Sequence, residues 1–131
     1  MAMKDKLLEL DTDRAITSVG NAYSESEINW GVANPNQGIG TKLKLQIVVK
    51  EAFDSTEEDA TLQFAIIHGA ATAPSDVLWT FDVIAEADLP KGLVIEYPWP
   101  EKHLQYTRIR SIVAVHDFTA GIIDAHVVAG Q

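Results

Sequence analysis

The chain has 131 residues, of which 47% are hydrophobic and 22% are charged, and this balance predicts one globular domain over residues 1–131. Nineteen Asp and Glu residues against ten Lys and Arg give a formal net charge of -9, which argues against nucleic-acid and anionic-membrane partners because both are bound through basic side chains. The chain contains no cysteine, so disulfides, thiolate nucleophiles and cysteine metal ligands are excluded.

The N-terminal residues 1–14 carry charge throughout and lack a long apolar core, so we expect no signal peptide. No apolar run approaches the roughly 18 to 20 residues that cross a bilayer. We therefore expect a soluble protein that is made in the cytoplasm. Residues 4–10 could form one or two helical turns, and residues 15–19 and 25–30 are weaker strand candidates.

Short segments with a period of two follow, separated by turn sequences rich in Pro, Gly and Asn. The clearest is 42–50, whose leucines, isoleucine and valine at every second position predict a strand with one buried face. Strands are also predicted at 61–68, 79–83, 93–97, 109–115 and 123–128, with one helical turn at 85–89. The side chains predicted to face the core are Leu43, Leu45, Ile47, Val49, Leu62, Phe64, Ile66, Trp79, Phe81, Val83, Leu93, Ile95, Tyr97, Ile109, Ser111, Val113, Val115, Ile123, Ala125 and Val127.

About eight antiparallel strands joined by turns predict an all-β fold, and specifically a jelly-roll β-sandwich. A closed barrel is the competing interpretation. In either fold the alternating sets would be buried, while a core of this size offsets chain entropy only narrowly. Oligomerisation or docking on a partner would therefore add stability.

No sequence motif indicates catalysis, and we expect neither an enzyme nor a cofactor. His116, Asp117, Asp124 and His126 could lie close enough to bind a divalent metal, but the spacing matches no known zinc motif and a polar outer face is the favoured interpretation. The acidic residues 54–59 lack the central glycine of a calcium loop and predict a solvated hairpin loop.

Three groups of residues are candidate contacts for a partner. Trp99 lies between two prolines, which would present its ring rigidly, although packing under its own loop is an equal alternative. Arg108 and Arg110 would point the same way from one strand, either as interface anchors or as partners of carboxylates such as Asp82 and Glu96. The leucines of the N-terminal segment could form a docking arm or fold back over one end of the sandwich; they are Leu7, Leu8 and Leu10.

The order of several short segments resembles that of phage capsid cement proteins of the Bbp16 type. The matching segments are Asp5 to Leu10 with Arg14 to Thr17, Ala60 to Ile66, Ala87 to Gly92 with Pro98, Tyr106 to Ile109, and Phe118 to Gly121. Each segment alone is weak, while their order and spacing along the chain are moderately specific.

The resemblance implies a jelly-roll protein without catalytic residues or cofactor. It would form a homo-oligomer, a dimer or trimer, on the exterior of a tailed-phage capsid and clamp adjacent copies of the major capsid protein. Two other classes stay open. One is a glycan-binding jelly-roll module of a phage surface or tail protein that uses Trp99, and the other is a metal-dependent jelly-roll enzyme that uses His126.

Overall fold

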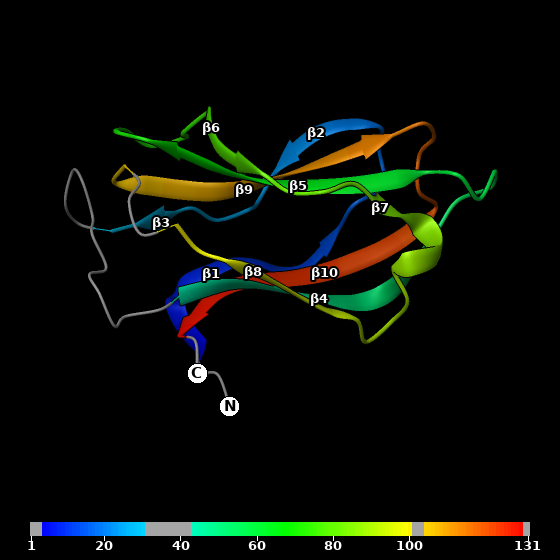
Figure 1. Ribbon diagram of the computed structural model, residues 1–131, viewed down its shortest axis with the longest axis horizontal. Helices are drawn as coiled ribbons and strands as arrows, with labels where there is room; N and C mark the ends of the chain where they lie inside the picture. Colours follow the sequence, from blue (N-terminus) through cyan, green and yellow to red (C-terminus); the bar gives the residue numbers. More distant parts are fainter. Residues whose placement is uncertain (1–3, 31–42, 101–103, 130–131) are drawn as a thin grey trace.

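The computed structural model describes residues 4–30, 43–100 and 104–129, which form two antiparallel sheets packed face to face (Figure 1). Sheet A has the strand order β1-β10-β4-β8, and sheet B has the order β2-β9-β5-β6, with β3 beside β9 and β7 beside β5. The elements are β1 (Lys4–Ala15), β2 (Gly20–Tyr23), β3 (Ile28–Asn29), β4 (Leu43–Asp54), β5 (Thr61–Gly69), β6 (Asp76–Thr80), β7 (Ile84–Ala85), the 3-10 helix η1 (Glu86–Asp88), β8 (Val94–Pro98), β9 (Tyr106–Ala114) and β10 (Ala120–Ala129).

The eight longer strands follow the jelly-roll pattern. The chain crosses between the sheets at each connection from one of these strands to the next except β5 to β6, so that strands distant in sequence become neighbours within a sheet. The predicted jelly-roll β-sandwich is confirmed, and the closed barrel is not adopted because each sheet keeps two edges. Sheet A ends at β1 and β8, and sheet B ends at β2 and β6.

The core lies between the central strands of the two sheets, and the period of two decides which side chains enter it. On β4, Leu45, Ile47 and Val49 are buried, and on β5 Leu62, Phe64 and Ile66 are fully buried. Each fully buried side chain of this size stabilises the fold by about 1.5–3 kcal/mol. The same alternation buries Ile109 and Val113 on β9 and Ile123, Ala125 and Val127 on β10.

The expected helical turns at residues 4–10 are wrong, because this segment belongs to β1. β1 pairs with β10 in an antiparallel register that shifts three times along its length. Such irregularities break the alternation of apolar and polar residues by which a strand is recognised in sequence. The hydrogen-bonding partner is more than a hundred residues away, so no local pattern indicates it.

The core face expected for residues 79–83 is wrong for Trp79 and Val83 and confirmed for Phe81. The strand is β6, and its register against β5 shifts between Ile66 and Ile67. Trp79 is 61% exposed and Val83 57%, whereas Phe81, just beyond the strand, is only 8% exposed. Val115 is likewise exposed, because it lies in the turn after β9 with a φ of 75°.

The remaining expectations concern short elements. The helical turn expected at 85–89 is confirmed as η1, and Leu89 behind it is buried and accepts a hydrogen bond from the Phe53 N–H. The segments 15–19 and 25–30 were the two weaker strand candidates. The structure places β2 one residue after the first of them and the two-residue β3 inside the second. Within the described ranges no helix is long and apolar enough to cross a membrane.

Candidate functional site

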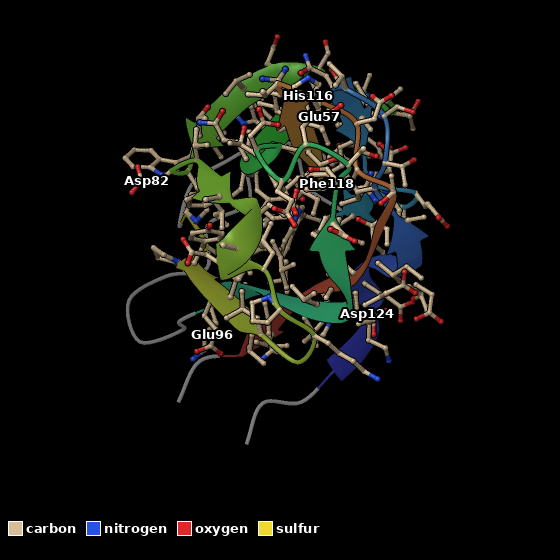
Figure 2. The ribbon with its side chains drawn as sticks, turned by 90° about the vertical axis from the view of Figure 1, so that its right-hand side faces the viewer. Glu57, Asp82, Glu96, His116, Phe118 and Asp124 are labelled. Carbon is tan, nitrogen blue, oxygen red and sulfur yellow. The ribbon has the colours of Figure 1, made fainter. Side chains whose placement is uncertain are left out.

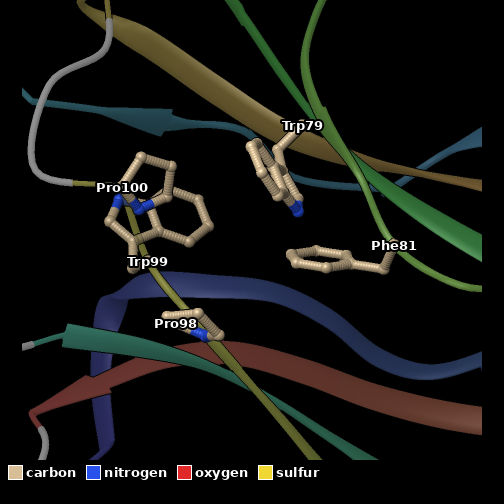
Figure 3. A pocket seen from close by; sticks show the side chains of 5 residues that line it. All are labelled: Trp79, Phe81, Pro98, Trp99 and Pro100. Carbon is tan, nitrogen blue, oxygen red and sulfur yellow. The ribbon is translucent and has the colours of Figure 1, made fainter.

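An apolar pocket of about 360 Å³ opens where β6 and β8 form the edges of their sheets (Figure 3). It is lined by five side chains, Trp79, Phe81, Pro98, Trp99 and Pro100, and is called the Trp79 pocket below. Trp79 and Phe81 come from sheet B, and the Pro-Trp-Pro segment comes from the end of β8 in sheet A. The pocket thus exists only because the sandwich brings two distant segments together.

Backbone and ring contacts hold the walls of the pocket in place. The Phe81 N–H donates to the Phe64 carbonyl at 2.9 Å, and the Phe81 ring stacks on Tyr97 with centroids 3.7 Å apart and planes 7° apart. The Trp99 N–H donates to the Leu43 carbonyl at 3.1 Å. Prolines on either side of Trp99 restrict the backbone φ, so this wall is pre-formed.

Trp79 is the accessible part of the pocket. Among the described residues its exposed fraction is the largest of the exposed large hydrophobic side chains, and Val77, two residues earlier on β6, is also exposed. Val94 on β8 adds further apolar surface to the same edge of the molecule. Exposed apolar surface beside a formed pocket is typical of an interaction site.

Carboxylates lie beside this apolar surface. Burial raises the pKa of Tyr97, and the negative charge of Asp82 raises it further, which places Asp82 near the ring that stacks on Phe81. Glu96 on β8 lies on the same side of the molecule (Figure 2) and pairs with Lys44 at 3.3 Å. In the described part of the chain Asp82 has no ion-pair partner, so it places one uncompensated negative charge near the pocket.

The structure corrects the role predicted for Trp79 and decides between the two alternatives left open for Trp99. Trp99 is only 6% exposed and packs on Trp30 at 6.0 Å between ring centroids, so its predicted role as a presented contact residue is corrected. It forms a wall of the pocket instead. Trp79, predicted as a core residue, is the exposed one.

Both arginines lie on β9 of sheet B, and their surroundings differ. The Arg108 guanidinium lies 3.7 Å from the centroid of the Tyr23 ring, and its Nε donates to the Pro74 carbonyl at 2.8 Å. It does not pair with Asp82 or Glu96. Arg110 is half-buried, and its Nε has no hydrogen-bond partner among the described residues. Neither arginine lines the Trp79 pocket.

The N-terminal leucines lie in β1 and not in a free arm. Leu10 is fully buried in the core, so its predicted role in docking is corrected. The side chains of Leu7 and Leu8 lie outside the described residues, and their predicted role stays a prediction. Pairing of β1 with β10 also gives this segment a place within sheet A, which is the alternative that the sequence left open.

The suggested metal ligands are separated in the fold. His126 is buried on β10, and its Nε2 lies 2.9 Å from the Gln46 Oε1. Asp124 accepts a hydrogen bond from the Asp13 N–H at 2.7 Å and pairs with Lys50 at 3.5 Å. Among the residues that the structure describes, no group of three His, Asp or Glu side chains is arranged to hold a metal ion.

His116, in the turn after β9, contacts the acidic loop between β4 and β5. Its Nδ1 lies 2.6 Å from the Asp59 Oδ1 and 4.0 Å from the Glu57 Oε2. The hydrogen bond to Asp59 is the main cause of a raised His116 pKa; desolvation opposes it, and the charges of Asp59, Glu57 and Asp117 raise the pKa further. The contact therefore links the loop between β4 and β5 to the turn after β9 through a titratable histidine.

This tie predicts a pH-dependent effect of His116→Gln. A histidine whose pKa is raised by folding stabilises the protein fully below its ordinary value of 6.5, and this stabilisation is lost as the pH rises through the folded-state pKa. The wild type should therefore have the higher Tm at about pH 5.5, and the difference should shrink towards about pH 9. An NMR titration of His116 with a midpoint at or below 6.5 would contradict the prediction.

Comparison with protein families gives a match. The model of a protein family described as Bbp16 matches residues 10–127. The matched region begins within β1 and ends within β10, so it includes both sheets and the Trp79 pocket. A search of curated proteins finds no match.

Proposed function

Because this chain belongs to the phage-associated Bbp16 family, we propose that it is a capsid cement protein of a tailed phage. In this role it binds the outer surface of the capsid and clamps adjacent subunits of the major capsid protein. The match over residues 10–127 is the observation that carries the proposal. It begins within β1 and ends within β10, so it spans both sheets and is not confined to a single motif.

Features of the fold support this role. The edge of the sandwich at β6 and β8 exposes apolar surface beside a formed pocket, as a docking protein requires. The formal net charge of -9 disfavours contact with packaged DNA, which would repel an acidic protein, and so favours the outer side of the shell.

Clamping follows from multivalency. A homo-oligomer, a dimer or trimer, presents the same surface two or three times, so after the first contact the second becomes intramolecular. Apparent affinity then rises by roughly 100- to 10,000-fold without any new contact. An interface between copies of this chain would itself bury about 800 Å² per partner and add stability to a small sandwich.

Binding to purified heads tests the proposal. Heads of the phage that encodes this chain, prepared without the protein, should bind added protein saturably in a sedimentation assay. Bound protein should raise the temperature at which the heads release DNA. Mass spectrometry of complete virions should detect the protein in high copy number. Its absence from virions, together with no binding to heads, would overturn the proposal.

A further inference from the structure

We propose that the Trp79 pocket binds an extended basic segment of a partner polypeptide, with an apolar side chain of that segment in the pocket and a Lys or Arg against Trp79 and Asp82. This inference rests on the proposed function, because the capsid then supplies the segment. It adds the chemistry of the contact and its place on the sandwich, neither of which the family match provides.

The residues that line the pocket indicate that it holds an apolar side chain of the partner segment. Its walls are two indoles, one phenyl ring and two proline rings, and its volume of about 360 Å³ is enough for a large apolar side chain. A sugar needs several hydrogen-bonding groups to fix its hydroxyls, and rings of this kind offer almost none. An apolar side chain of a polypeptide is therefore the better fit.

The negative charge near the pocket indicates that the partner segment carries a Lys or Arg. Asp82 lies close to Tyr97, whose ring stacks on the pocket residue Phe81. Beside it the exposed Trp79 offers the face of an indole, the aromatic ring that attracts cations most strongly. A carboxylate without an ion-pair partner in the described part of the chain, next to an exposed indole, is complementary to a Lys or Arg.

The position of the pocket selects an extended segment. β6 and β8 are each paired on one side only and end their sheets, so the pocket opens between two strand edges. Proteins recognise extended peptides at such edges, where side chains at alternate positions enter pockets. The exposed Val77 on β6 and Val94 on β8 add apolar surface to the two strands that flank the pocket.

Variants that spare the fold test the proposal on heads prepared without the protein. Trp79→Ala removes an exposed ring and should weaken binding at least about tenfold, as loss of a central aromatic contact does. Asp82→Lys should weaken binding and flatten its dependence on salt. Val19→Ala, at an exposed valine before β2, and Glu51→Lys, at an exposed position on β4, are the matched controls and should bind as wild type.

A cross-link identifies the segment. The chain contains no cysteine, so Val77→Cys creates a single attachment point for a benzophenone on β6, two residues before Trp79 in the sequence. The cross-linked capsid peptide should contain Lys or Arg together with a large apolar residue. A cross-link to a second copy of this chain, or to an acidic peptide, would overturn the inference.

The outcomes separate the two proposals. If wild-type protein does not bind heads, the proposed function fails and this inference with it. If wild type binds while Trp79→Ala and Asp82→Lys bind equally well, the cement role stands and the Trp79 pocket is not the contact. Circular dichroism and Tm of each variant should match wild type, because both altered side chains are exposed.

Discussion

Replacing Gly121 by alanine is expected to destabilise the protein by about 2–5 kcal/mol. Gly121 has a φ of 151°, which side chains rarely adopt, and lies where the register of β10 against β4 shifts. A Cβ at this position would come within 2.3 Å of the Phe53 ring. That ring is buried and packs edge-on against Phe118 with centroids 4.9 Å apart, so it has little room to move.

Two further variants distinguish the steric clash from backbone strain. Gly92→Ala has the same kind of strain, with a φ of 90°, but its Cβ would meet no atom within 4 Å, so about 1–2 kcal/mol is expected. Phe53→Leu combined with Gly121→Ala should cost less than the sum of the two single changes, because the smaller side chain relieves the contact. Chemical denaturation measures the free energies of unfolding of Gly121→Ala, Gly92→Ala, Phe53→Leu and the double variant. Equal losses for Gly121→Ala and Gly92→Ala would contradict the clash.

Removing the guanidinium of Arg14 is expected to cost about 3–5 kcal/mol, because it leaves a buried carboxylate without its cation. Arg14 Nε lies 2.9 Å from the Asp11 Oδ1, and Arg14 Nη2 donates to the Ser111 Oγ at 3.3 Å. Both charged side chains are almost fully buried. The pair connects β1 of sheet A to β9 of sheet B, so its loss also weakens the contact between the sheets.

The variant for this test is Arg14→Met, and its effect should depend on pH. Burial raises the pKa of Asp11, although Arg14 and the N–H of Glu25 act in the opposite direction. A carboxyl whose pKa is raised by folding contributes stability that is present at low pH and is lost as the pH rises through the folded-state pKa. Without Arg14 that pKa rises further, so the loss caused by Arg14→Met should shrink as the pH falls towards about 4.

A double variant provides the control. Asp11→Asn with Arg14→Met removes both charges and should recover much of the stability lost in Arg14→Met alone. Urea unfolding of the single and double variants measures the coupling between the two residues. If the double variant is as unstable as the sum of the single ones, the carboxylate is not the source of the loss.

The sequence was sufficient for the central strands and for the fold class. The alternation along β4, β5, β9 and β10 depends only on the direction of successive Cβ atoms, which is a local property of extended backbone. Leu45, Phe64, Ile109 and Ile123 were accordingly predicted as core residues and are fully buried. Regular turns between such segments favoured the jelly roll, which the strand order confirms.

The candidate site was not predictable in the same way. Trp79 was predicted as a core residue and is exposed, whereas the sequence left open whether Trp99 is presented or packed, and the structure shows it packed. Exposure depends on which strand covers a residue, and a shift in the register of β6 against β5 changes which side chains point outward. A segment twenty residues later, from the other sheet, then completes the pocket.

The sequence by itself therefore determined an acidic, cysteine-free, all-β chain and the strands at its centre, because composition and local side-chain alternation suffice for these properties. Only the tertiary structure decided that residues 4–10 are a strand, that Leu10 is buried and that Trp79 is exposed. These features arise from pairing between β1 and β10 and from irregular registers at the sheet edges, and long-range pairing leaves no periodic trace in the segment that it orders.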